Sequence, residues 1–261
     1  MIYITGDTHG EFGRRFNTKI FPEQKKMTKE DYLIVCGDYG GIWDLDGESK
    51  EEKNWLKWFD TRNYTLLFVD GNHENFNRLY SYPEKEWNGG RVHEIRPNIL
   101  HLMRGQIFEL CGKKIFTFGG AQSHDIAYGI LDRDDPKFNE KKKSLNKDKK
   151  FYRIKNESWW EQELPSAEEM DEGLKNLEAH SWNVDFIITH CCATSTQELI
   201  NEWRIQELKK EGRYTPNILT DYLEEIKNRT QYNMWFFGHY HDIKIVNDNE
   251  EMIYEQIIQI T

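Results

Sequence analysis

Five short polar segments constrain the fold of this chain more than any other feature. Each follows an apolar run that is rich in β-forming residues, directly or after one residue. The segments are Gly6–Gly10 after Ile2–Thr5, Gly37–Gly41 after Tyr32–Cys36, Gly71–Glu74 after Leu66–Val69, Thr189–His190 after Val184–Ile188, and Gly238–His241 after Met234–Phe237. Polar residues at the ends of successive strands meet at one edge of a sheet, where open α/β folds place their sites. We therefore expect an α/β fold with a functional site at that edge.

The residue types in these segments point to metal binding. Gly, Asp and Asn are common in turns and helix caps, so turn chemistry explains any single segment. It does not explain the histidines, because five of the nine in the chain lie in these segments: His9, His73, His190, His239 and His241. Imidazole nitrogens mixed with carboxylate and amide oxygens suit Mn²⁺, Fe²⁺ or Zn²⁺. Mg²⁺ and Ca²⁺ sites are richer in oxygen ligands.

The order of the motifs resembles the calcineurin-like metallophosphoesterase superfamily. The motifs are GDTHG, GDYGG, GNHE, a lone His after a strand, and GHYH, and they span residues 6–241. The resemblance implies a four-layer α/β/β/α sandwich of two mixed sheets flanked by helices. It also implies a dinuclear metal centre at the strand ends. We interpret residues 1–261 as a single domain of this kind.

The resemblance assigns the ligands position by position. It implies that Asp7, His9 and His241 hold one ion, that Asn72, His190 and His239 hold the other, and that Asp38 bridges them. We expect two divalent ions, with Mn²⁺ favoured and Fe, Zn or Ni as alternatives. Two ions about 3.5 to 4 Å apart can hold both the attacking and the leaving oxygen of a phosphoryl displacement. The nucleophile would be a metal-bound hydroxide, and Asp38 would be catalytic through the bridge.

His73 is the second catalytic candidate. The resemblance places it above the ions, where an imidazole can stabilise phosphoryl oxygens or protonate the leaving group. The alternative is a structural histidine.

The segment Gly119–Asp125 is a candidate for substrate contacts. A glycine pair after the expected strand Lys114–Phe118 allows a close backbone approach, so His124 and Asp125 are candidate substrate-binding residues. A surface-loop histidine is equally compatible with the sequence. With residues 158–160 and 163–165, this stretch resembles a bacterial and phage subgroup of the same superfamily.

Residues 137–155 are strongly basic in an acidic chain. They carry nine Lys or Arg against two acidic residues, a net charge of +7, whereas the whole chain carries −10. Such a block is typical of a solvated, mobile insertion. The alternative is an electrostatic funnel for a phosphorylated or polyanionic substrate.

The rest of the sequence predicts scaffold. The strands Gln106–Leu110 and Lys114–Phe118 form a hairpin, and the closing strands are Ile243–Val246 and Met252–Ile260. The expected helices are Lys50–Asp60, Ser166–His180 with a capping box of Ser166 and Glu169, Ser195–Lys210, and a helix started by Pro216 that ends at Arg229.

Several protein classes are disfavoured by the sequence. No apolar run reaches membrane-spanning length and no signal peptide precedes Ile2, so we expect a cytoplasmic protein without membrane contacts. The four cysteines form neither a zinc-finger pattern nor a disulfide framework, so we expect reduced thiols.

Three functions are compatible with these observations. A metal-dependent phosphomonoesterase acting on a phosphoprotein or a small phosphate ester is favoured. A phosphodiesterase or nuclease is the second, since the net acidity of the chain counts against nucleic acid without excluding it. A non-catalytic binding module that keeps the fold is the third. The protein-phosphatase branch usually has Asp-Arg-Gly after its second motif, whereas this chain has Gly40-Gly41-Ile42, which weakens an assignment to that branch.

Overall fold

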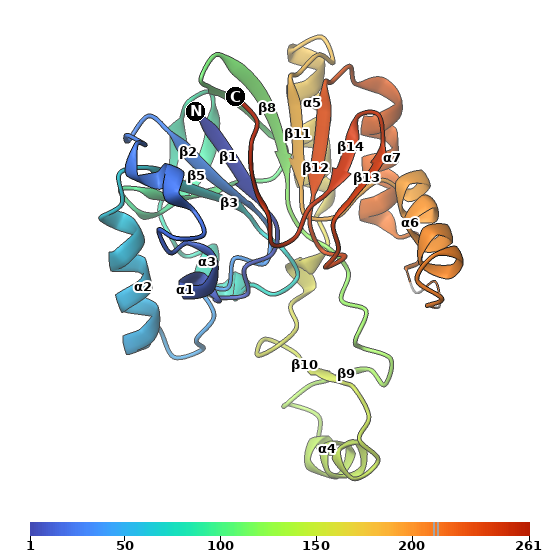
Figure 1. Cartoon of the computed structure of the whole chain (residues 1–261). Helices are drawn as coiled ribbons and strands as arrows, with labels where there is room; N and C mark the ends of the chain where they lie inside the picture. The colour runs from blue at the N-terminus through green and yellow to red at the C-terminus, as the bar shows by residue number, and fades with distance from the viewer. Residues whose placement is uncertain (211, 213) are drawn as a thin grey trace.

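Two facing β-sheets form the centre of the computed structural model, which describes residues 1–210, 212 and 214–261 (Figure 1). The first sheet has seven strands in the order β15-β1-β2-β3-β6-β5-β4. Its strands are β1 (Ile2–Thr5), β2 (Tyr32–Cys36), β3 (Thr65–Val69), β4 (Glu84–Trp87), β5 (Gly90–Arg96), β6 (Ile99–Leu102) and β15 (Ile257–Gln259). β1, β2, β3 and β6 are parallel, whereas β15 and β5 run antiparallel to their neighbours β1 and β6, so the sheet is mixed.

The second sheet has six strands in the order β13-β14-β12-β11-β8-β7. Its strands are β7 (Gln106–Leu110), β8 (Lys113–Phe118), β11 (Phe186–Thr189), β12 (Met234–Phe237), β13 (Lys244–Asn247) and β14 (Glu250–Met252). β8, β11, β12 and β14 are parallel, and β7 and β13 are antiparallel to them.

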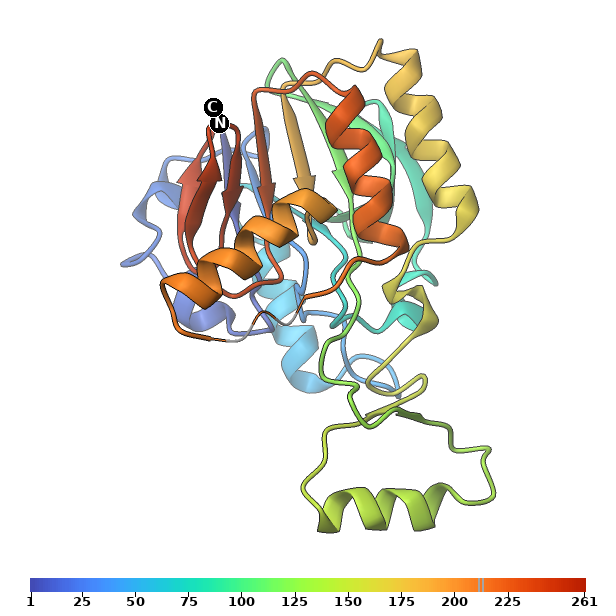
Figure 2. The same cartoon turned by 90° about the vertical axis from the view of Figure 1, so that its right-hand side faces the viewer.

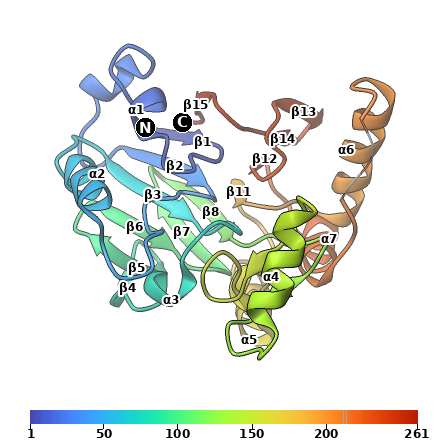
Figure 3. The same cartoon turned by 90° about the horizontal axis from the view of Figure 1, so that it is seen from below.

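Helices cover the outer face of each sheet, as the view from below shows (Figure 3). The first sheet packs against α1 (Phe12–Arg15), α2 (Lys50–Asp60) and α3 (Phe76–Leu79), and the second against α5 (Ala167–Ala179), α6 (Thr194–Gln206) and α7 (Ile218–Arg229). A third apolar cluster, which includes Ile4, Ile34, Ile188 and Phe236, fills the space between the sheets. The expected four-layer α/β/β/α sandwich of two mixed sheets is therefore confirmed. Short 3-10 turns lie at Pro22–Lys25 and Glu161–Glu163.

Helix starts follow their capping residues. In α5 the Ser166 hydroxyl accepts a hydrogen bond from the Glu169 backbone N–H at 3.2 Å, and the Glu169 carboxylate accepts one from the Ser166 N–H at 2.7 Å, so the predicted capping box is present. α7 begins at Ile218, because the Asn217 side chain accepts from the N–H groups of Leu219 and Thr220. The prediction that Pro216 starts this helix was wrong.

The C-terminal apolar run belongs to both sheets. Residues 252–260 were expected to form one closing strand, but β14 ends at Met252 in the second sheet and β15 begins at Ile257 in the first. Between them the chain crosses over, and the Tyr254 carbonyl accepts a hydrogen bond from Gly6 N–H. β15 then pairs with β1, so the last strand of the chain lies beside the first.

Residues 124–159, which we call the arm, extend away from the sheets (Figure 2). The arm contains β9 (Ile130–Leu131), α4 (Phe138–Lys147) and β10 (Arg153–Ile154), and β9 pairs with β10. The lysine-rich segment of residues 137–155 thus contains α4 and β10, and its mobility stays a prediction. Within the arm, Phe138 of α4 is buried, whereas Lys141 and Lys143 of the same helix are exposed. Whether this charge guides a substrate stays a prediction.

None of the helices in the described part of the chain combines the length and the apolar character needed to cross a membrane.

Candidate active site

The five polar segments meet at one edge of the two sheets. β1, β2 and β3 are parallel in one sheet, and β11 and β12 are parallel in the other, so each segment leaves the carboxyl end of its strand. Hydrogen bonds join the segments directly: His9 N–H donates to the Asp38 carbonyl at 2.8 Å, and His239 N–H donates to Asp7 Oδ1 at 2.9 Å. His73 N–H donates to Asp38 Oδ1 at 2.7 Å. The backbone therefore fixes where the side chains lie.

One group of potential ligands comes from the first, second and fifth segments. One donor atom each from Asp7, His9, Asp38 and His241 lies within 4.8 Å of the others. His241 Nε2 is 3.0 Å from Asp7 Oδ2 and 3.0 Å from His9 Nε2. The two carboxylates are buried, so a cation here would meet oxygen and nitrogen donors at once. This donor set fits a borderline divalent ion.

A second group lies on the other side of Asp38. His190 Nε2 is 3.3 Å from Asn72 Oδ1 and 3.5 Å from Asp38 Oδ1. The His239 ring lies 5.1 Å from the His190 ring, measured between centroids. Asp38 Oδ2 faces the first group, at 3.8 Å from His9 Nε2. The Asp38 carboxylate therefore lies between the two groups, which is the position of a bridging ligand.

The His190 ring is held with Nε2 turned toward the other candidate ligands. Its Nδ1 lies 2.7 Å from the Cys36 carbonyl oxygen and donates a proton to it, so Nε2 faces Asn72 and Asp38. Gly37 makes this approach possible. A Cβ at this position would lie 2.1 Å from His190 Nδ1, and its φ of +89° is one that side chains rarely adopt.

Four of the seven expected ligands have unusual backbone conformations. His9, Asp38, His239 and His241 have φ values of 45°, 48°, 67° and 53°. Such left-handed conformations cost about 1 to 3 kcal/mol each and cluster at functional sites. Their concentration here indicates that the surrounding hydrogen bonds hold these residues in place for function.

Burial and neighbouring charges tune the site. Burial alone would raise the pKa of Asp38, but the His190, His73 and His9 imidazoles outweigh it and hold that pKa well below its usual range. Burial opposes the charged form of His190, yet Asp38 and Asp7 raise the pKa of His190 to about 10. The carboxylate between the two groups is therefore ionised, as a ligand must be.

The structure brings all seven expected ligands together, and their role as ligands stays a prediction. His73 lies at the rim of the site, with its ring 5.4 Å from that of His9. The His124 ring lies 5.7 Å from the His239 ring, so this candidate is next to the second group. Asp125 is further out and forms an ion pair with Arg153.

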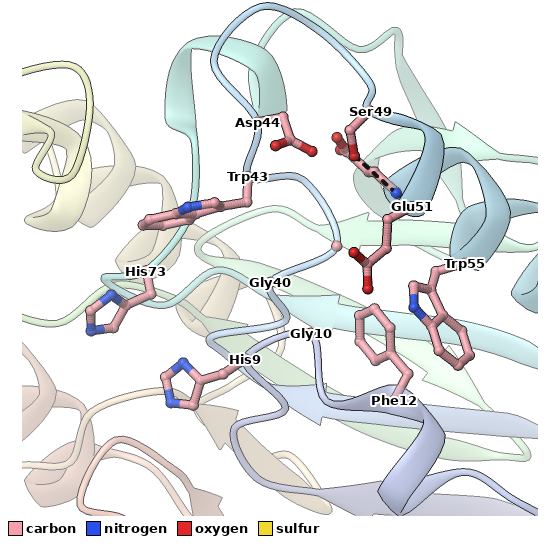
Figure 4. Close-up of a pocket in the computed structure, with 12 residues that line it drawn as sticks. His9, Gly10, Phe12, Gly40, Trp43, Asp44, Ser49, Glu51, Trp55 and His73 are labelled. Atoms are coloured by element: carbon pink, nitrogen blue, oxygen red, sulfur yellow. Dashed lines mark hydrogen bonds between the residues drawn. The ribbon is translucent and has the colours of Figure 1, made fainter.

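A cavity of about 350 Å³ opens beside the first group (Figure 4). His9 and His73 lie on one side of this cavity and Trp55 on the opposite side, and the Trp43 ring lies on the side of His73, 6.1 Å from its ring. The carboxylate of Glu51 points into the space. A leaving group of modest size fits here.

Three functional candidates were missed by sequence reasoning. Arg153 lies against His73, and its position inside the basic block made it look like a solvated residue. The Ser123 hydroxyl accepts from Asn72 Nδ2 at 3.3 Å, and Ser123 N–H donates to the Glu163 carboxylate at 3.1 Å. Ser123 and Glu163 therefore orient Asn72 from behind. The signals in the sequence were the glycine pair before Ser123 and the resemblance of residues 119–125 and 163–165 to a bacterial and phage subgroup.

The cysteines beside His190 are packing residues. Cys191 and Cys192 are buried, and their sulfur atoms lie 3.3 and 3.0 Å from the Tyr240 hydroxyl oxygen. Burial raises the pKa of both thiols, that of Cys191 to about 11. Thiolate formation is therefore disfavoured. All four cysteines of the chain are free.

Comparison with known proteins agrees with this geometry. The model of the calcineurin-like phosphoesterase family matches residues 1–242. The chain belongs to this family. The motifs of the sequence predicted this membership.

Relatives of this chain include several lariat debranching enzymes. It is 27% identical over 145 residues to lariat debranching enzyme A of Xenopus laevis, and the aligned region covers 51% of this chain and 26% of the relative. It is 24% identical over 257 residues to the lariat debranching enzyme of Drosophila pseudoobscura pseudoobscura, and the aligned region covers 92% of this chain and 42% of the relative. The chain thus spans less than half the length of these relatives. A solved structure of phosphopantetheinyl hydrolase from Mycobacterium tuberculosis aligns over 97% of this chain and 87% of its own, with a TM-score of 0.45 and 13% identity.

Glu163→Gln is expected to change how the stability of the folded chain depends on pH. Burial raises the pKa of Glu163 from 4.5 to about 8. Between these values the unfolded chain ionises this carboxyl and the folded chain does not, so its contribution to stability falls as pH rises and levels off above about pH 8. Glutamine removes that loss.

Urea unfolding of both proteins from pH 5 to 8 measures the effect. The free energy of unfolding of Glu163→Gln, minus that of the wild type, should rise by up to about 1.4 kcal/mol per pH unit. Glu161→Gln, at an exposed neighbour, serves as the control. A difference that stays constant with pH would contradict the assignment.

Proposed function

We propose that the chain is a metal-dependent phosphomonoesterase that uses two divalent ions, with Mn²⁺ favoured. The observation that carries this proposal is the convergence of six residues with nitrogen or oxygen donors around the buried Asp38 carboxylate. When bound, a pair of divalent ions activates water and neutralises phosphoryl oxygens.

The residues present fit such a pair. Asp7, His9 and His241 would hold one ion, and Asn72, His190 and His239 the other, with Asp38 between them. The His190 proton on Nδ1 and the Ser123 contact to Asn72 orient the two donor atoms before any ion binds. This preorganisation favours a binding site over a chance cluster.

His73 would act on the substrate from the rim. Its backbone N–H is held by Asp38, and its ring lies between the first group and Arg153. From there an imidazole can give a proton to the departing oxygen.

The adjoining cavity favours a small ester over a polyanion. Its lining includes the acidic residues Asp44 and Glu51 beside the indoles of Trp43 and Trp55. A third acidic residue of the lining, Glu52, is paired with Arg78. Negative charge at this wall repels a leaving group that carries further phosphates. A neutral or cationic leaving group suits it better.

A phosphodiesterase is the second candidate. The relatives are named lariat debranching enzymes, a name that describes removal of a branch, and a branch joined through phosphate is a diester. The lysines of α4 would supply phosphate contacts on such a substrate. A binding module without activity is the third candidate.

Substrate preference distinguishes the three candidates. Metal-free protein is reconstituted with Mn²⁺, and kcat/KM is compared for p-nitrophenyl phosphate and bis(p-nitrophenyl) phosphate. We expect faster turnover of the monoester. Preference for the diester would overturn the monoesterase assignment in favour of the second candidate, and metal binding without cleavage of either ester would favour the third.

A further inference from the structure

An arginine from the arm lies at the rim of the candidate metal site. Arg153 Nη2 is 3.4 Å from His73 Nε2, although the two residues are eighty positions apart in sequence. The Arg153 side chain is only 16% exposed, in contrast to the exposed lysines of the same basic block. This residue therefore belongs to the site and not to the solvated face of the arm.

Two features hold Arg153 in place. The Asp125 carboxylate accepts two hydrogen bonds from the guanidinium, one from Nε at 2.9 Å and one from Nη2. The backbone of Arg153 is fixed by pairing of β10 with β9, opposite Ile130, and by a 3.3 Å hydrogen bond from its N–H to the Gly129 carbonyl. A two-point ion pair of this kind orients the guanidinium plane before a ligand arrives.

The Arg153 guanidinium has N–H donors that Asp125 does not use. It has five N–H donors, of which Asp125 takes one from Nε and one from Nη2. Among the described residues, the Nη1 group donates to no acceptor. Arg153 can therefore bind further oxygen atoms without losing its contact to Asp125.

We propose that Arg153, held by Asp125, forms a subsite for the non-bridging oxygens of a terminal phosphoryl group. The subsite lies beside His73, on the side of the candidate metal site that the arm faces. This inference rests on the proposed function and deepens it, since it names the part of the chain that would select a terminal phosphate.

Charge explains the selectivity. A terminal phosphoryl group of a monoester carries up to two negative charges and three non-bridging oxygens, whereas a diester carries one charge and has one of these oxygens esterified. A fixed guanidinium binds the former more strongly because both the Coulomb attraction and the number of acceptors are larger. Arg153 would thus separate monoesters from diesters.

Binding of inorganic phosphate tests the subsite without relying on turnover. Calorimetry on Mn²⁺-loaded protein compares the wild type with Arg153→Gln, Arg153→Lys and Arg133→Gln. Arg133 is the matched control, because it lies in the same arm and pairs with Glu157 but does not contact His73. We expect about ten- to hundred-fold weaker phosphate binding for Arg153→Gln, partial recovery for Arg153→Lys, and no change for Arg133→Gln.

The ester pair gives a second readout. Arg153→Gln should lose more kcat/KM on p-nitrophenyl phosphate than on its diester, so the monoester preference should shrink by about ten-fold or more. A structural defect would lower both rates together. Circular dichroism checks that each variant is folded.

The outcomes distinguish failure of the Arg153 subsite from failure of the proposed function. Unchanged phosphate binding by Arg153→Gln, equal weakening in Arg133→Gln, or a wild type that does not bind phosphate overturns the subsite. A wild type that binds phosphate through Arg153 but cleaves neither ester retains the subsite and overturns the proposed function instead.

Discussion

Asp38→Asn is expected to reduce kcat/KM by more than about a hundred-fold and to lower the bound metal below two ions per chain. Changes to groups that only support a ligand typically cost 10- to 100-fold in metal affinity or activity. Asp38 faces both donor groups, with Oδ2 toward His9 and Oδ1 toward His190, so its loss affects two ions at once. An amide keeps the shape but lacks the charge that holds two cations close together.

Metal content and turnover are measured on the same preparations. Elemental analysis after Mn²⁺ loading gives the stoichiometry, and p-nitrophenyl phosphate gives the rate. Asp46→Asn is the matched control, because it makes the same change at an exposed position of the segment that follows Asp38. Full activity in Asp38→Asn with two ions bound would remove the basis for a bridging role.

The strands and the site edge could be predicted because their signals are local. Apolar runs such as Tyr32–Cys36 form strands with the expected bounds, and the glycine and aspartate that follow this run adopt the positive φ angles that its turn requires. Parallel pairing then places the ends of β1, β2 and β3 at one edge. The convergence of the ligands follows from the topology, so sequence order was enough to anticipate it.

The position of Arg153 could not be predicted because it depends on tertiary contacts. Nothing in a block of nine basic residues distinguishes the one that folds back onto His73. The pairing of β10 with β9 and the ion pair with Asp125 select it, and both partners come from a different part of the arm.

The pKa of Glu163 and the strand boundaries after Met252 also depend on the tertiary structure. Glu163 is an ordinary acidic residue in the sequence, and its burial in the folded chain, at 1% exposure, is the main cause of its raised pKa. The apolar run after Met252 reads as one strand, although it serves two sheets in turn. The prediction of a single strand over residues 252–260 was wrong for this reason. In both cases the surroundings in the folded chain, and not the short segment itself, decided the outcome.

His73→Ala is expected to lower kcat by about 10²- to 10⁴-fold on an alkyl phosphate, which is the range of general acid catalysis. An alkoxide is a poor leaving group and needs a proton as the bond to phosphorus breaks. The His73 ring lies beside His9 at the mouth of the cavity that would receive this group. On p-nitrophenyl phosphate the loss should be much smaller, because nitrophenolate leaves without a proton.

The ratio of the two losses separates the roles of His73. Proton donation predicts a large loss on the alkyl ester alone, whereas stabilisation of phosphoryl oxygens predicts similar losses on both esters. His180→Ala is the control, because His180 lies at the end of α5 and bonds to the Asn176 carbonyl. Unchanged rates on both esters would leave His73 with a structural role. The contact between His73 and Arg153 gives this comparison a further use, since a double variant tests whether the two residues act on the same phosphoryl group.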